Sequence, residues 1–371
     1  MRVFLNVNMK QEPVQQNNKM LGLEIIRFIS AFSVLVWHYQ NFFYIADKPI
    51  NFIREQQPLY HFLSFFYEYG YRGVQVFWCI SGFIFFWKYR ETISSKIITY
   101  KKFFVLRFSR LYPLHFFTLM FVVFLQAVYK YKKEYFFIYQ NNDITHFIYQ
   151  LFLASHWGFE KGFSFNGPIW SISVEVLIYC FFFLVLQKIS KSFIINVAVL
   201  LICITAEYFN FKSSIFSCLA YFYVGGLSAI SLKYIQSTKY AKLISYFFLF
   251  FLLTYPLIIF IPNIYQHKYF EHFFLMSYTP ALLFFTAQHF SVAPFIQKTI
   301  ETAGNITYSS YLIHYPLQLV IVICFMFAEK EVPYYSEMFL VGFIFITLFA
   351  SYYLYKLFEL PVQNRIRKKF A

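Results

Sequence analysis

The first long apolar stretch of the chain, MLGLEIIRFISAFSVLVWHYQNFF at residues 20–43, contains three ionisable residues, Glu24, Arg27 and His38. It is long enough to cross a bilayer as a helix, which takes about 20 residues. An ionisable group inside such a span is costly unless it is paired or faces a wet cavity. We therefore expect the three side chains to have partners inside the protein or a function there.

The spacing of these residues predicts how they share the helix surface. His38 lies eleven residues after Arg27, which returns it to within about 20° of the same face, displaced by about 16 Å along the axis. Glu24 lies three residues before Arg27 and can pair with it. The alternative is that Arg27 snorkels to the interface while His38 is an ordinary core histidine.

Apolar blocks of about 17 to 25 residues recur along the whole chain, as bilayer-spanning helices require. The sequence is 59% hydrophobic and 13% charged, whereas a soluble domain is typically about 25% charged. A transmembrane barrel would show shorter segments of alternating polarity. We predict an all-α, polytopic integral membrane helical bundle of about ten transmembrane helices. The predicted spans are 20–43, 73–87, 111–129, 168–187, 193–208, 215–232, 243–261, 272–290, 306–328 and 336–355.

The distribution of basic residues predicts the orientation of the bundle. With a cytoplasmic N-terminus, the inner segments carry 21 Lys and Arg and the outer loops carry 10, so both termini are expected in the cytoplasm. The net charge of +15 then reflects the bilayer partner, and no nucleic acid partner is expected. We divide the chain into an N-terminal tail at 1–19, a transmembrane domain at 20–356 and a basic C-terminal tail at 357–371. The five cysteines show no CxxC or Cys/His ligand spacing, so no metal site is expected.

Two stretches inside or beside the predicted spans bring further polar side chains. In RFSRLYP, Arg107 and Arg110 precede Pro113, placed at a helix start, and two guanidinium groups suit phosphate binding. In NGPIWSISVEVLIY at 166–179, Ser171, Glu175 and Tyr179 are four residues apart and share a helix face. The alternative for the two arginines is that they anchor the end of the span, as the positive-inside rule describes. The alternative for Glu175 is a structural hydrogen bond between helices.

Small and polar residues mark two more stretches. GVQVFWCISGFIFF contains Ser81-Gly82, a small-residue pair that permits close helix packing. GNITYSSYLIHYPL, residues 304–317, places Tyr308, Tyr311 and His314 at the start of a span. Taken alone, a histidine at such a position is more often a packing or interface residue than a catalyst.

These stretches together resemble the acyltransferase-3 family of integral membrane acyltransferases over nearly the whole chain. The marks of the resemblance are Arg27-x10-His38, GVQVFWCISGF, the RxxR of Arg107 and Arg110 with Pro113, PIWSISVE, GNITYSSYLIHYP and FELP at 358–361. The resemblance implies transfer of an acyl group, most often acetyl from acetyl-CoA, to a hydroxyl of an envelope carbohydrate. The expected location is then the bacterial inner membrane, with acyl-CoA and a glycan or lipid-linked sugar as partners.

On this interpretation acetyl-CoA is a donor substrate, and no permanently bound cofactor is expected. Arg107 and Arg110 would bind the CoA phosphates, and His38 would be the general base, in direct transfer or through a covalent acyl intermediate. Glu175 would orient the imidazole, Ser171 is a further catalytic candidate, and Arg27 would hold the thioester or a phosphate, or brace the bundle. The competing hypotheses are a transporter or flippase that uses Arg27, His38 and Glu175 as a polar relay, and a structural membrane partner without turnover.

Overall fold

The computed structural model describes residues 20–50, 52–189, 191–209, 211, 213–261, 270–288 and 291–370. In this part of the chain nearly all regular structure is helical, apart from a two-residue hairpin that pairs Tyr44 with Pro49 and Ile45 with Lys48. The α-helices are α1 Leu21–His38, α2 Tyr60–Tyr69, α3 Gly73–Ser94, α4 Tyr100–Lys133, α5 Ile144–Leu151, α6 Trp170–Leu184, α7 Phe193–Tyr208, α8 Ser214–Gln236, α9 Ala241–Thr254, α10 Phe270–Thr286, α11 Pro294–Asn305, α12 Thr307–Phe327, α13 Glu337–Leu354 and α14 Leu360–Phe370. The predicted N-terminal tail, residues 1–19, lies outside the described residues.

A helix overlaps each of the ten predicted spans, and α7 coincides with the predicted range. Seven helical segments in the described part of the chain are long and apolar enough to cross a membrane, and α7 and α10 hold shorter apolar stretches. A chain of this kind satisfies its backbone hydrogen bonds within each helix, which the bilayer interior demands. The predicted polytopic helical membrane bundle is therefore confirmed.

One boundary predicted from the sequence is wrong. The helix that was expected to start near Leu111 starts at Tyr100, so Pro113 lies inside α4 and not at its start. Thr99 caps the helix by accepting a hydrogen bond from the backbone N–H of Lys102 at 3.3 Å. The basic side chains of residues 100–110 lie on the first turns of α4, because a helix that extends past the bilayer surface tolerates charge. Most of the expected C-terminal tail, residues 357–371, is helical as well, because it forms α14, which packs against α4.

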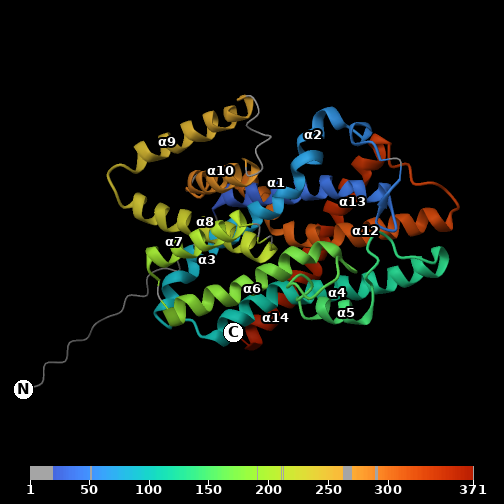
Figure 1. Ribbon diagram of the computed structural model, residues 1–371, viewed down its shortest axis with the longest axis horizontal. Helices are drawn as coiled ribbons and strands as arrows, with labels where there is room; N and C mark the ends of the chain where they lie inside the picture. The colour runs from blue at the N-terminus through green and yellow to red at the C-terminus, as the bar shows by residue number, and fades with distance from the viewer. Residues whose placement is uncertain are drawn as a thin grey trace, which may run out of the picture.

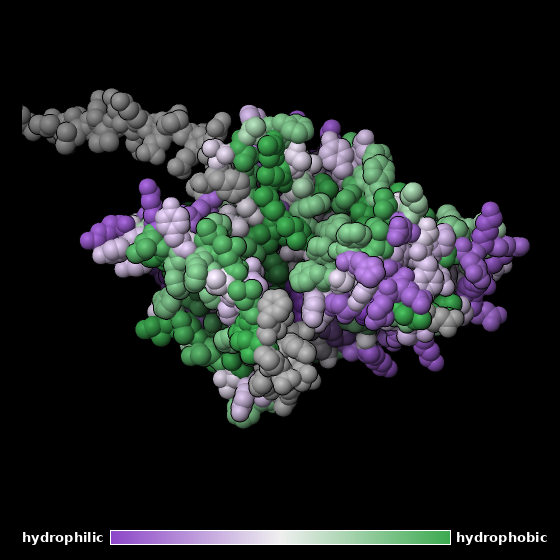
Figure 2. Space-filling view, turned by 90° about the horizontal axis from the view of Figure 1, so that it is seen from above, coloured by the Kyte–Doolittle hydropathy of each residue, from purple (hydrophilic) through white to green (hydrophobic). Residues whose placement is uncertain are grey.

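Figure 1 shows how the helices surround α1. Helices α7 to α10 lie on one side of it and α12 and α13 lie on the other, while α4 and α14 cover one face. Figure 2 shows hydrophobic side chains over the middle of the molecule and hydrophilic side chains at both ends of its long axis. A hydrophobic middle between two hydrophilic ends suits a bundle that crosses a bilayer.

Helices α3 and α8 approach each other closely because a glycine of each faces the backbone of the other. A Cβ on Gly82 would lie 1.8 Å from the Phe222 carbonyl oxygen, and a Cβ on Gly225 would lie 1.9 Å from the Cys79 carbonyl oxygen. Neither distance is possible for a real side chain. Close backbone packing of this kind is a main source of helix association in membranes, and it fixes the position of α3 beside the candidate site.

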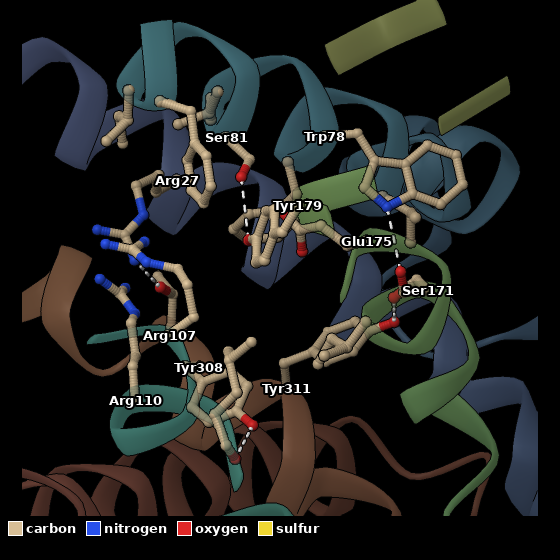
Figure 3. A pocket seen from close by; sticks show the side chains of 18 residues that line it. Arg27, Trp78, Ser81, Arg107, Arg110, Ser171, Glu175, Tyr179, Tyr308 and Tyr311 are labelled. Carbon is tan, nitrogen blue, oxygen red and sulfur yellow. Dashed lines mark hydrogen bonds between the residues drawn. The ribbon is translucent and has the colours of Figure 1, made fainter. Parts of the chain in front are cut away.

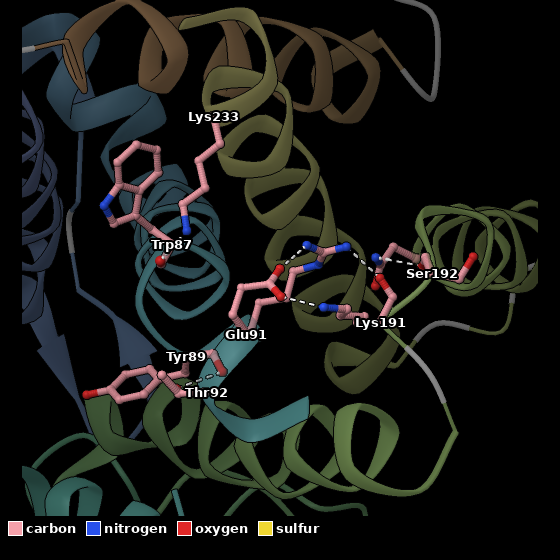
Figure 4. A network of polar contacts seen from close by, with 9 residues as sticks. Trp87, Tyr89, Glu91, Thr92, Lys191, Ser192 and Lys233 are labelled. Atoms are coloured by element: carbon pink, nitrogen blue, oxygen red, sulfur yellow. Dashed lines mark hydrogen bonds and ion pairs between the residues drawn. The ribbon is translucent and has the colours of Figure 1, made fainter. Parts of the chain in front are cut away.

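A polar network joins three helix ends at one end of the bundle (Figure 4). Lys191 Nζ lies 2.6 Å from Glu91 Oε2, and Arg90 donates hydrogen bonds to Glu91 and to the Lys191 carbonyl oxygen, each at 2.6 Å. Lys233 donates to the Trp87 carbonyl oxygen at 2.7 Å. The C-terminal ends of α3 and α8 and the chain before α7 therefore lie together, as alternating spans require.

Candidate active site

Five helices, α1, α3, α4, α6 and α12, enclose a cavity of about 130 Å³. Each of the five sequence stretches described above, from residues 20–43 to residues 304–317, contributes side chains to its wall. Figure 3 shows the guanidinium groups of Arg27, Arg107 and Arg110 gathered on one side, with Ser171 and Trp78 on the other. The cavity therefore has a cationic end and a hydroxyl-rich end, both inside the helical bundle.

Arg27 enters the cationic end from α1 with its charge already compensated. Its Nη1 lies 2.8 Å from Glu24 Oε2, and both side chains are nearly buried. Its Nη2 donates to Thr307 Oγ1 of α12 at 3.2 Å. A Cβ on Gly304 would lie 1.9 Å from the Glu24 carboxylate, so the glycine of GNITYSS leaves the room that the ion pair needs. The pairing of Arg27 with Glu24 predicted from their spacing is confirmed.

Arg107 and Arg110 both enter the cavity from α4. Arg107 donates a hydrogen bond to the Tyr89 hydroxyl, and its guanidinium lies 4.7 Å from the ring centre of Phe85. Arg110 makes no hydrogen bond or close ion pair among the described residues. A partly buried guanidinium without a partner is costly, so Arg110 is well placed to take an anionic ligand.

A third arginine, Arg367 of α14, approaches the same pair from outside the cavity. Its Nε donates to Ser109 Oγ at 3.2 Å and its Nη2 to the Leu106 carbonyl oxygen at 3.4 Å. The positive charge of Arg367 repels the positive charges of Arg107 and Arg110. No carboxylate lies within ion-pair distance of these three arginines in the described part of the chain. Sequence reasoning missed Arg367, because it lies 257 residues after Arg110 and belongs to no recognisable motif with it.

Glu175 lies between the two ends of the cavity (Figure 3). It comes from α6, and the hydroxyl groups of Ser81 and Tyr179 are close enough to interact with its carboxylate. Those two hydroxyls are themselves 3.1 Å apart. The charges of Arg107 and Arg110 act on Glu175 from the cationic end. The prediction that Ser171, Glu175 and Tyr179 share one helix face is confirmed, since all three line the cavity.

Ser171 forms the hydroxyl-rich end together with Tyr311. Their hydroxyl oxygens are 2.7 Å apart, and the Tyr311 hydroxyl donates to the Pro168 carbonyl oxygen at 2.8 Å. Trp78 donates from its indole nitrogen to the Ser171 carbonyl oxygen at 3.3 Å. These bonds tie α3, α6 and α12 together and hold the Ser171 hydroxyl at the wall of the cavity.

His38 does not line the cavity. It is buried at the end of α1, and its ring centre lies 4.8 Å from that of His314, which in turn lies 6.0 Å from that of Tyr311. No hydrogen bond or ion pair joins His38 to Glu175 among the described residues, so the expected orientation of one by the other has no direct contact to support it. His38 is thus separated from the cavity by the rings of His314 and Tyr311.

The hydrogen bonds of the two imidazoles determine their tautomers. Nδ1 of His38 lies 2.9 Å from the Val34 carbonyl oxygen, and Nδ1 of His314 lies 3.2 Å from the Ser310 carbonyl oxygen. Because a carbonyl oxygen can only accept a hydrogen bond, each Nδ1 carries the proton and each neutral ring has a lone pair on Nε2. That tautomer is the one a general base needs, and Nε2 of buried His314 has no hydrogen-bond partner in the described structure.

The structure thus brings together Arg27, Arg107, Arg110, Ser171 and Glu175, and it places His38 apart from them. Residues that the sequence did not identify as site residues include Trp78, Thr307 and Arg367, besides the buried Glu359, which accepts a hydrogen bond from Ser309 of α12. Glu359 belongs to the FELP segment at residues 358–361, to which the sequence analysis assigned no role. That segment was the signal that could have identified Glu359.

A family model described as an acyltransferase domain matches residues 20–356, nearly the whole chain. No curated protein and no solved structure matches the chain. The matched range includes α1, α3, α4, α6 and α12, the five helices that line the cavity.

Proposed function

The chain belongs to the acyltransferase-3 family of integral membrane acyltransferases, and we propose that it transfers an acetyl group from acetyl-CoA to a hydroxyl of an envelope carbohydrate. We further propose that it resides in the bacterial inner membrane with both termini in the cytoplasm. The acceptor would be a sugar of a lipopolysaccharide, capsule or exopolysaccharide, presented free or on a lipid carrier.

The observation that carries this proposal is the unpaired Arg110 guanidinium at the cationic end of a cavity that leads to Glu175 and Ser171. The phosphates of CoA are multiply charged, and guanidinium groups bind phosphate oxygens through charge-assisted hydrogen bonds. Arg107, Arg110 and Arg367 would hold the phosphates, while the thioester arm extends into the cavity. The acyl carbon would then lie near the hydroxyl-rich end.

The transfer step needs a base for the acceptor hydroxyl. Nε2 of His38 would accept the sugar hydroxyl proton as the sugar oxygen attacks the thioester carbonyl carbon, and the CoA thiol leaves with a proton returned from the imidazole. His314 and Tyr311 lie between His38 and the cavity, so their rings must shift, or relay the proton, when both substrates are bound. Glu175 would act in the cavity by accepting hydrogen bonds from the donor or acceptor, and not by contact with His38.

The test is thiol release by purified protein in lipid, measured against acetyl-CoA concentration with an acceptor glycan present. Arg110→Ala should raise KM for acetyl-CoA by about 10- to 100-fold, because a hydrogen bond to a charged group contributes about 1.5–3 kcal/mol. His38→Ala should lower kcat by about 10²- to 10⁴-fold at any concentration of acetyl-CoA. Excess donor should therefore rescue the first variant and not the second.

Arg365 is the matched control for the arginine, because it is exposed on α14 and lines no part of the cavity. Arg365→Ala should behave like the parent. Loss of kcat at unchanged KM in Arg110→Ala, or near-parent kcat in His38→Ala, would refute the assignment of donor site and base. A protein that moves sugar across the membrane without releasing CoA thiol would be a transporter.

A further inference from the structure

A second cluster of polar side chains lies outside the cavity, where the segment after α5 meets the start of α8. His156 Nε2 lies 3.0 Å from Ser214 Oγ, and His156 Nδ1 lies 3.0 Å from Glu160 Oε1. A serine, a histidine and an acid in this order are the parts of a nucleophilic triad, in which the base activates the hydroxyl and the acid orients the base. None of these three residues lines the cavity described above.

The imidazole of His156 is held by neighbours on several sides. Its backbone N–H donates to Ser173 Oγ at 3.0 Å, and its ring stacks on Phe163 and meets the ring of Trp170 edge-on at 5.2 Å. Glu160 is anchored as well, because its Oε2 accepts the Gly158 N–H at 2.9 Å and leaves Oε1 for the imidazole. The cluster is therefore a defined arrangement, with positions fixed by α6 and by its own loop.

Burial of the His156 ring favours the neutral form that a general base needs. In the tautomer with the ring proton on Nδ1, toward the Glu160 carboxylate, the lone pair of Nε2 faces the Ser214 hydroxyl. Burial lowers the pKa of His156, and the negative charge of Glu160 opposes that shift only in part. The contact between Nδ1 and Oε1 has the distance but not the alignment of a hydrogen bond, a looseness that is common in unliganded catalytic sites.

The serine is accessible and lies at a favourable position. Ser214 is the first residue of α8, its side chain is half-buried, and the His156 side chain is 25% exposed. Developing negative charge next to Ser214 would be stabilised by the N-terminal end of this 23-residue helix. Ser213 caps the helix by accepting from the Ile215 N–H at 3.2 Å, so Ser214 is not needed for that purpose.

We propose that Ser214, His156 and Glu160 form a second acyl-transfer site that takes short acyl groups from esters of alcohols. Ser214 Oγ attacks the ester carbonyl carbon and gives its proton to His156 Nε2. The alcohol oxygen leaves with that proton, and the acyl group stays on Ser214. Water then attacks the acyl-serine with His156 again as base, which releases the carboxylic acid and restores the serine.

This second site lies close to the cavity, but its proposed reaction does not involve acetyl-CoA. Trp170 contacts His156 on one side and, at 5.7 Å between ring centres, the cavity residue Trp78 on the other. Ser214 lies at the opposite end of α8 from Lys233 and the polar network of Figure 4, about 30 Å away along the helix. The site therefore lies at the end of the bundle where the proposed acceptor glycan is expected.

The test is covalent labelling of the full chain in lipid by a fluorophosphonate probe, with the modified residue located by mass spectrometry. We expect the label on Ser214. Ser214→Ala should remove it, and His156→Gln should slow labelling by about 100-fold or more, because a positioned base contributes about 10²–10⁴. Glu160→Gln should slow it less, since the amide still accepts the Gly158 N–H but lacks the charge.

Ser213→Ala is the matched control, because it removes a neighbouring serine that only caps α8, and it should label like the parent. Hydrolysis of p-nitrophenyl acetate should follow the same order of variants. An unlabelled Ser214 in the folded parent, or labelling that His156→Gln leaves unchanged, would overturn the proposal and leave the cluster a loop anchor. Neither readout uses acetyl-CoA, so the result is separate from that of the donor-site test.

Discussion

Among the arginines around the cavity, Arg27 alone forms a close ion pair within the described residues, while Glu175 and Glu359 act on Arg110 from a greater distance. Arg27 is neutralised by Glu24, while Arg107, Arg110 and Arg367 have no carboxylate at ion-pair distance among the described residues. Three like charges placed close together repel each other, and at a partly buried site the repulsion is only weakly screened. An anion bound there relieves it, so the protein without ligand is arranged for anion binding.

Arg367 is expected to contribute to donor binding although it lies outside the cavity. Arg367→Gln should raise KM for acetyl-CoA by about 3- to 10-fold with little change in kcat, because a charge that acts on the phosphates alone stabilises ground state and transition state equally. Thiol release against acetyl-CoA concentration measures the effect, and Arg365→Gln is the control. A loss confined to kcat would place Arg367 in a different role.

Glu175 is expected to be needed for its charge. Glu175→Gln keeps the shape of the side chain and its contacts with Ser81 and Tyr179, so insertion and folding should be retained while thiol release falls strongly, by about 10²-fold or more. Glu337, which is exposed at the start of α13, gives the control Glu337→Gln. If the Glu175 variant turns over at the parent rate, the carboxylate is only structural.

At the scale of single residues, the sequence predicts contacts between residues that are close in the chain. It does not predict contacts between residues that are far apart in the chain. The Glu24–Arg27 pair and the shared face of Ser171 and Glu175 follow from helix spacing alone. The separation of His38 from Glu175 does not, because it depends on how α1 and α6 are placed by other helices. The same holds for Arg367, which reaches the site only because α14 packs on α4.

At the scale of helices, apolar length identified the spans well and charge misled about their ends. The hydrophobic range 193–208 coincides with α7, because lipid selects a continuous apolar segment. Residues 100–110 form the first turns of α4 although they carry four basic side chains. Hydropathy reports where a helix leaves the hydrocarbon region, and the end of the helix itself is set by its cap, here Thr99.

The contact of α3 with α8 should be intolerant of even one methyl group. Gly82→Ala would place a Cβ against the Phe222 carbonyl oxygen, and overpacking of this kind costs about 1–3 kcal/mol. We expect a lower Tm in detergent and a lower yield of monodisperse protein. Gly342→Ala is the control, since nothing lies within 4 Å of a Cβ there. Equal Tm values for the two variants would mean that α3 and α8 pack less closely than described.

For the whole molecule, two polar clusters mark opposite ends of the bundle. The network of Glu91 and Lys191 includes Lys233 near the C-terminal end of α8, whereas the cluster of His156 includes Ser214 at the N-terminal end of the same helix. The short loops at the Glu91 end carry many basic residues, so we predict from the positive-inside rule that this end faces the cytoplasm. The contacts at each end of the bundle join segments that alternating spans would place on the same side of the membrane. Which of the two ends faces the cytoplasm can be tested.

The topology prediction is that residue 97 faces the cytoplasm and residue 131 faces the outside. Ile97 precedes α4 and is 72% exposed, and Tyr131 near the other end of α4 is 87% exposed. The helix between them has 34 residues, about 50 Å at 1.5 Å per residue, so the two positions must lie on opposite sides of the bilayer. In a background without the five native cysteines, Tyr131→Cys should react with a membrane-impermeant maleimide in intact cells with a permeable outer barrier, and Ile97→Cys only after the inner membrane is opened. The reverse pattern would show that the protein has the opposite orientation in the membrane. Arg107 and Arg110 would then face outward, which would rule out cytoplasmic acetyl-CoA as their ligand.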